Sequence, residues 1–134
     1  MLKLFDRVFG WLLVLASCGH TVGTFLWTQR MSGISIWSLG SSLAAGLVAT
    51  LNIVRAGRSD DKTLAAIAAI GTACWALVAF GFGVSIGNVL DPRPLGHVVI
   101  SMVLVIFSGI TLWRKTNEGH SPMRDATAAL NSRG

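Results

Sequence analysis

Charged residues are scarce in this chain and are missing altogether from four long stretches. Only 13% of the 134 residues are Asp, Glu, Lys or Arg, whereas 52% are hydrophobic. A soluble domain carries about 25% charged residues. A chain this short cannot bury so much apolar surface in a core surrounded by water. The composition therefore excludes an ordinary soluble domain and predicts an integral membrane protein.

The four uncharged stretches define the expected fold. A helix needs about 20 residues to cross a hydrocarbon layer of about 30 Å, and each stretch is long enough. Short connections join the stretches, so successive helices are expected to lie antiparallel. The prediction is an all-α integral membrane protein with an up-down-up-down bundle over residues 1–115 and a polar tail over 116–134. The expected spans are residues 8–27, 34–54, 63–90 and 95–113.

Motifs for catalysis and metal binding are also missing. The chain has no P-loop, no His-Glu-x-x-His, no Gly-x-Ser-x-Gly and no paired acids in the apolar stretches. Its two cysteines, Cys18 and Cys74, form no C-x-x-C or zinc spacing and are expected to be small apolar fillers. A proton-coupled transporter usually keeps a charged residue in the membrane as its coupling site. The sequence therefore predicts no enzyme and makes a pore or small transporter the least favoured function.

Positive charge is distributed unevenly between the two sides of the expected bundle. Of the eleven Lys and Arg residues, only Arg30 and Arg93 lie on the side opposite the chain termini. Cytoplasmic loops carry an excess of Lys and Arg, so both termini are expected in the cytoplasm. This orientation predicts a multi-pass protein of the cytoplasmic membrane. Nucleic acid is not an expected partner, because no basic face is interleaved with aromatic residues.

The segment "LASC", residues 15–18, matches the lipobox of bacterial lipoproteins, in which the cysteine becomes lipidated. Apolar sequence continues from Cys18 to Trp27 and completes a full span, whereas a processed lipoprotein usually continues as a polar tether. Asp6 is also unusual in the positively charged region that precedes a cleavage site. We therefore expect Cys18 to lie within an intact transmembrane helix.

Each expected helix carries one face of small and polar residues. Helices in lipid gain stability from close backbone approach and interhelical hydrogen bonds, so these faces should meet each other. On the first helix, Gly19 and Gly23 form a G-x-x-x-G packing motif, and Cys18 points away from His20. The stripes on the second, third and fourth helices are Ser35, Ser38, Ser42, Ala45 and Ala49; Ala65, Ala69, Thr72, Ala76, Ala79 and Gly83; and His97, Ser101, Leu104, Ser108 and Thr111.

Two histidines, His20 and His97, are the only ionisable residues within or at the edge of the apolar stretches. Ionisable groups in the membrane are candidates for function by default. With a rise of 1.5 Å per residue, His20 should lie about 10 Å below the outer boundary and His97 about 3 Å below it. The candidate ligand-binding residues are His20, Ser17, Thr24, His97 and Ser101.

Two interpretations of the histidines stay open. They could hold haem b as its two axial ligands, although a depth difference of about 7 Å counts against this. Alternatively, a quinone-like or lipid-like ligand could bind beside His20, or His20 could simply bond a hydroxyl of a neighbouring helix while His97 sits among the headgroups.

A structural or accessory role is the leading functional expectation. A small protein without catalytic motifs would pack against itself or a larger membrane complex through its Gly/Ala/Ser faces, as a homo-oligomer or a subunit. A binding protein for haem or a quinone-like or lipid-like ligand at His20 and His97 is the alternative.

Overall fold

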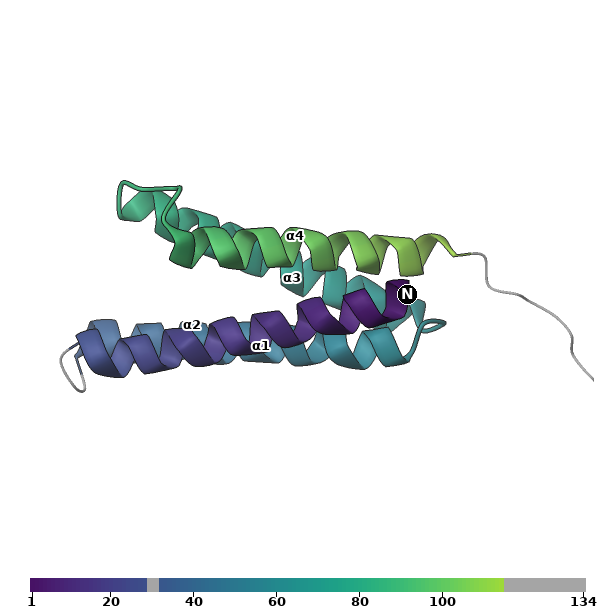
Figure 1. The fold of residues 1–134 in the computed structure, drawn as a ribbon, viewed down its shortest axis with the longest axis horizontal. Helices are drawn as coiled ribbons and strands as arrows, with labels where there is room; N and C mark the ends of the chain where they lie inside the picture. Colours follow the sequence, from purple (N-terminus) through teal and green to yellow (C-terminus); the bar gives the residue numbers. More distant parts are fainter. Residues whose placement is uncertain (29–31, 115–134) are drawn as a thin grey trace, which may run out of the picture.

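The computed structural model describes residues 1–28 and 32–114, and the expected tail, 116–134, lies outside the described residues. The described residues form four helices and no strand: α1 (Leu2–Trp27), α2 (Gly33–Gly57), α3 (Lys62–Ser85) and α4 (Pro92–Trp113) (Figure 1). Each helix is long and apolar enough to cross a membrane. The chain is therefore a multi-pass membrane protein, and its described residues form an all-helical fold.

Figure 1 shows two pairs of neighbouring helices, the α1–α2 hairpin and the α3–α4 hairpin. The hairpins meet near the N-terminus and diverge toward the opposite end of the bundle. We call the end that holds Met1 and the α2–α3 connection the closed end. The end that holds Trp27 and the α3–α4 connection is the open end.

The helix ends differ from the expected spans. α1 begins at Leu2 and α2 continues to Gly57, because a helix extends beyond the uncharged stretch that crosses the hydrocarbon. α3 ends at Ser85 rather than residue 90. There Gly87 has a φ of 70°, and the amide of Asn88 bonds the carbonyl of Gly83 at 3.1 Å. This is a Schellman motif, in which a residue with positive φ, usually glycine, closes the helix.

A proline is the first residue of α4. The sequence analysis had placed this proline in the connection before the helix. The helix begins at Pro92, three residues before the expected start at residue 95. Proline is favoured at the first helical position, where its missing N–H would have no intrahelical partner. The Asp91 carboxylate caps the helix by accepting the amide N–H of Arg93 at 2.9 Å. This earlier start moves His97 further into the bundle.

The interior of the bundle is built from small and polar side chains, as the stripes predicted. Stripe residues of α2, α3 and α4 are mostly buried, and the large apolar side chains point outward, as expected for a surface in contact with lipid. Leu13, Ala45, Ala49, Trp75 and Leu104 form the apolar core. Ser38, Ala69 and His97 are half-buried.

The closest approach between α1 and α2 does not use the G-x-x-x-G pair. A Cβ added at Gly19 would have no atom within 4 Å, and one at Gly23 would meet only Trp27 of its own helix. A Cβ at Gly10 would instead lie 2.7 Å from Cγ1 of Ile53. Gly19 and Gly23 therefore do not bring two helices of this chain together, because Gly19 faces outward.

Candidate functional site

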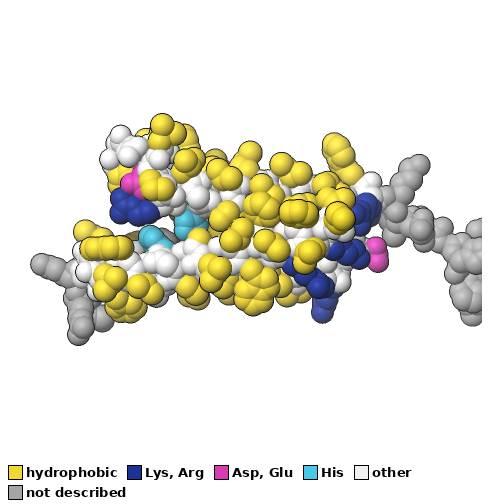
Figure 2. Space-filling model, in the orientation of Figure 1, with side chains coloured by type: hydrophobic (Ala, Val, Ile, Leu, Met, Phe, Trp, Pro, Cys, Tyr) yellow, Lys and Arg dark blue, Asp and Glu magenta, His cyan; other side chains and the backbone are white. Residues whose placement is uncertain are grey.

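His20 of α1 and His97 of α4 approach each other at the open end. Their ring centroids lie 6.4 Å apart, and their ring planes are tilted by 83°. Both side chains are half-buried. Figure 2 shows histidine side chains in the hollow between the two hairpins. The two histidines therefore converge, although they come from different hairpins.

Counted from the helix ends, the two histidines lie at similar distances from the open end. His20 lies about 10 Å from the end of α1 at Trp27, and His97 about 8 Å from the start of α4 at Pro92. The sequence analysis began the fourth helix at residue 95 and so placed His97 too close to the surface. The proline at the first helical position accounts for the missing turn.

A chain of hydroxyl groups fixes the protons on His20. Nε2 of His20 lies 3.0 Å from Oγ of Ser38, and this oxygen lies 2.6 Å from Oγ1 of Thr24. Thr24 donates its single proton to the backbone carbonyl of His20 at 2.9 Å. All three contacts are hydrogen bonds at once only when Ser38 donates to Thr24 and accepts from His20, because each hydroxyl has only one proton. His20 therefore carries its proton on Nε2, and its neutral form keeps a lone pair on Nδ1.

An indole group fixes the protons on His97. Nε1 of Trp75 donates to Nδ1 of His97 at 3.3 Å, and the two rings are 5.5 Å apart and nearly perpendicular. The indole nitrogen can only donate, so Nδ1 of His97 must be the acceptor. His97 is therefore neutral, with its proton on Nε2. Because Trp75 is buried in the core, packing restricts the orientation of this contact.

The other three predicted site residues, Ser17, Thr24 and Ser101, differ in their contacts. Ser17 donates to the carbonyl of Ser42 at 2.6 Å and so joins α1 to α2. Thr24 bonds the backbone carbonyl of His20 directly, and it reaches the imidazole ring only through Ser38. Ser101 lies one turn after His97 and is fully buried. Within the described residues, its hydroxyl and that of Ser108 have no hydrogen-bond partner.

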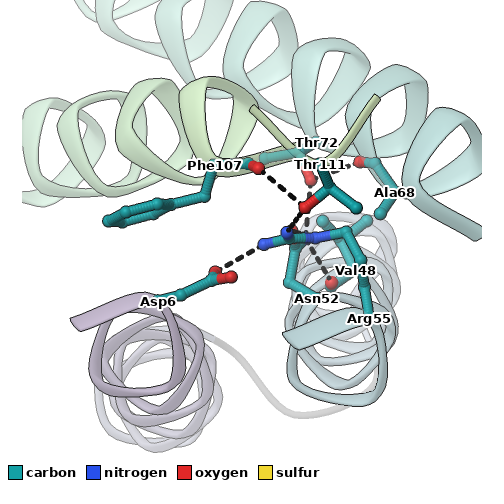
Figure 3. A network of polar contacts seen from close by, with 8 residues as sticks. All are labelled: Asp6, Val48, Asn52, Arg55, Ala68, Thr72, Phe107 and Thr111. Atoms are coloured by element: carbon teal, nitrogen blue, oxygen red, sulfur yellow. Dashed lines mark hydrogen bonds and ion pairs between the residues drawn. The ribbon is translucent and has the colours of Figure 1, made fainter. Parts of the chain in front are cut away.

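A second polar cluster lies at the closed end, and the sequence analysis missed it (Figure 3). Arg55 of α2 forms a buried ion pair with Asp6 of α1 at 2.5 Å. Its guanidinium also donates to Thr111 of α4 at 3.3 Å. Asn52 lies one turn before Arg55 and donates to Thr72 of α3 at 2.7 Å. These contacts connect all four helices.

The four uncharged stretches contain no carboxylate or basic side chain, but the helices that carry them do. Asp6 and Arg55 lie inside α1 and α2, because both helices extend past the uncharged stretches. Asn52, the only amide side chain in the second uncharged stretch and three positions before Arg55, was the available signal. A cavity of about 20 Å³ beside the pair is lined by residues that include Lys3 and Arg114. A cavity of this size holds about one water molecule.

No cluster of metal ligands lies in the described part of the chain, where His, Cys, Asp and Glu side chains do not gather in groups of three or more. Cys18 and Cys74 are free and exposed on the outer surface.

Comparisons with protein-family models, with curated proteins and with solved structures found no match to this chain.

Proposed function

We propose that this chain is a membrane-embedded binding protein for a small lipophilic ligand, held by His20 and His97 at the open end. One observation carries the proposal: the two rings come within 6.4 Å of each other. Each is already anchored through one nitrogen, His20 by Ser38 and His97 by Trp75. The second nitrogen of each ring has no partner among the described residues. Such convergent polar groups in an apolar setting are typical of ligand sites.

The hydrogen bond of His97 to Trp75 disfavours haem at this pair. An iron ligand must offer a lone pair to the metal, and a ligating histidine usually donates its other N–H to an acceptor. The partner of His97 Nδ1 is the N–H of Trp75, which is a donor. The proton of His97 must then lie on Nε2, the nitrogen that would face iron. The quinone-like or lipid-like ligand is the better supported of the two predicted ligand classes.

A structural or accessory role receives less support from the geometry. The Gly/Ala/Ser faces that were expected to meet a partner are largely occupied inside the bundle, where Ser42, Ala45, Ala65 and Ala79 are buried. A homo-oligomer or larger complex would have to form mainly through the bulky outer faces. The accessory role stays a prediction from the sequence.

A continuous pore is also disfavoured. Leu13 is seven residues from both Asp6 and His20 along α1, and Leu104 is seven residues from both His97 and Thr111 along α4. Both leucines are fully buried and belong to the apolar core. This apolar layer lies between the polar clusters of the two ends.

The orientation of the bundle in the membrane is part of the same proposal and is inferred from the positions of the basic residues. Lys3, Arg7, Arg58 and Lys62 belong to the closed end, where basic side chains also gather in Figure 2. Positive charge favours the cytoplasmic side. We therefore place both termini in the cytoplasm, with an up-down-up-down bundle in the cytoplasmic membrane. The histidine pair then lies in the outer half of the bilayer.

Extraction of the purified protein tests the function. The full chain is purified in mild detergent, and small molecules are extracted and identified by mass spectrometry. We expect a lipophilic compound with the wild type and with the Cys18→Ala control, whose side chain is exposed on the opposite face. The double variant His20→Ala/His97→Ala should lose it while staying folded by size-exclusion chromatography. Equal amounts in the folded double variant and the wild type would contradict the proposal.

A further inference from the structure

The histidine pair presents two different hydrogen-bonding groups to a ligand. Trp75 fixes His97 with its proton on Nε2, so this nitrogen is a donor. The Thr24–Ser38 chain fixes His20 with its proton on Nε2, so Nδ1 is an acceptor in the neutral ring. One donor and one acceptor thus remain for the ligand.

We infer that the ligand carries a neutral hydroxyl head group on an apolar tail, which accepts from His97 Nε2 and donates to His20 Nδ1. This inference rests on the proposed function. A hydroxyl group is the smallest group that accepts and donates through a single atom. Hydrogen bonds of 2.7–3.2 Å allow one oxygen to connect two nitrogens up to about 6 Å apart. The two ring centroids are 6.4 Å apart. The bridge requires the two free nitrogens to face the gap, which brings them closer together than the centroids.

Charge and location narrow the ligand further. His97 is neutral, and Arg93, one turn before it on α4, is paired with Asp91 at 2.7 Å. Neither offers an unpaired positive charge to a carboxylate or phosphate, and an unpaired charge in hydrocarbon is costly. The site lies about 8–10 Å along the helices from the open end, inside the apolar zone. The rim of the hollow in Figure 2 carries apolar side chains together with a basic and an acidic group. These features favour an apolar tail that stays in the lipid while the hydroxyl group enters between the hairpins.

A hydroquinone and a long-chain alcohol both carry such a head group. Trp75 is the positioning residue in both cases, because it keeps His97 a donor without touching the ligand itself. A head group that can only accept would leave the lone pair of His20 unused. A head group that can only donate would face the N–H of His97.

The test compares four probes on the full-length wild type in mild detergent by native mass spectrometry. The probes are decylubiquinol, kept under anaerobic conditions, decylubiquinone, the dimethyl ether of decylubiquinol, and decanol. We expect decylubiquinol to bind about tenfold more tightly than its ether, which accepts but cannot donate. If decanol matches decylubiquinol, an aliphatic alcohol is the source. If decanol binds more weakly by tenfold or more, a hydroquinone is the source.

Trp75→Phe adds a readout that a purely structural role would not change. Without the indole donor, His97 can place its proton on either nitrogen, so the preference for decylubiquinol over its ether should shrink. Trp113→Phe, at an exposed site at the other end of α4, is the matched control and should keep the preference.

The outcomes separate the inference from the proposed function. Equal binding of decylubiquinol and its ether, lost in His20→Phe or His97→Phe, would overturn the hydroxyl inference and leave the binding function standing. Probe binding that is unchanged in both folded histidine variants would overturn both. Failure of all four probes to bind the wild type, or a spectrum typical of iron with two histidine ligands after haemin is added, would also overturn the inference.

Discussion

The polar side chains at the two ends of the bundle differ in whether they bond the other hairpin or their own. At the closed end, Asn52 and Arg55 of α2 reach across to Thr72 and Thr111 of the other hairpin. Among the described residues these are the only side-chain hydrogen bonds between the hairpins. At the open end, the polar side chains bond within their own hairpin, Ser38 to His20 and Trp75 to His97.

This difference shows how the fold allows a site between the hairpins. Cross-linked polar groups hold the hairpins together at one end, whereas internally bonded groups allow them to diverge at the other. The histidines therefore face each other across the gap without closing it by a direct hydrogen bond. The comparison predicts that substitutions at the closed end act mainly on stability and that those at the histidine pair act mainly on ligand retention.

The largest effect is expected from Arg55→Met, which removes the cross-link and leaves Asp6 buried without its partner. Breaking a buried ion pair in this way costs about 3–5 kcal/mol of unfolding free energy. Thermal unfolding in detergent measures the loss. The double variant Asp6→Leu/Arg55→Met should recover most of it, because it leaves no buried charge unpaired.

Arg58→Met is the matched control for that loss, since Arg58 is exposed just beyond α2. It should change stability little, because exposed ion pairs contribute about 0–1 kcal/mol. If Arg55→Met unfolds at the same temperature as Arg58→Met, the contacts of Arg55 with Asp6 and Thr111 do not stabilise the closed end.

A smaller loss is expected from Gly10→Ala, which tests close packing near the closed end. The added Cβ would lie 2.7 Å from Cγ1 of Ile53 and force the two helices or the isoleucine to shift. Overpacking of this kind costs about 1–3 kcal/mol. Gly19→Ala, with open space around its Cβ, should be neutral or slightly stabilising because alanine favours helix. Equal losses in both variants would show that α1 is rotated from its described position.

The faces of the helices could be predicted from the sequence, but the ends of the helices could not. The period of 3.6 residues places Ser42, Ala45 and Ala49 on one face whatever the bundle geometry, and this face is buried. The absence of charged residues marks the part of a helix that lies in hydrocarbon. It does not mark the residue at which the helix itself begins or ends. For this reason Asp6 and Arg55 were assigned outside the spans.

The two clusters differ in how far the sequence could have revealed them. The Asp6–Arg55 pair joins residues 49 positions apart, and no local pattern links them. The convergence of the histidines was within reach, because Pro92 at the start of α4 carries the signature of a first helical residue. Use of that rule would have placed His97 near the depth of His20. The proton positions on the two rings could be assigned only from the contacts with Ser38 and Trp75 in the structure.

Ser17→Ala should have a modest effect and separates Ser17 from the site. It removes the bond from Ser17 to the Ser42 carbonyl, and side-chain hydrogen bonds in membrane bundles average about 0.6 kcal/mol. Ligand retention should stay at the wild-type level, since this bond lies within the α1–α2 hairpin. Ser41→Ala is the control, because the Ser41 hydroxyl bonds only its own helix, at Trp37. Loss of the ligand in Ser17→Ala would show that Ser17 belongs to the binding site, as the sequence predicted.

The smallest effect concerns the α4 cap at the open end and depends on pH. Hydrogen bonds from the Arg93 side chain, followed by its backbone amide, lower the pKa of Asp91 from 3.8 to about 2. Because the folded pKa lies below the unfolded one, the cap contributes fully above about pH 4. Its contribution falls as the carboxylate is protonated near pH 2. We therefore expect the difference in melting temperature between the wild type and Asp91→Asn to be constant from pH 7 to 5 and to shrink between pH 4 and 2. A constant difference down to pH 2 would mean that the charge of Asp91 does not stabilise the turn that positions His97.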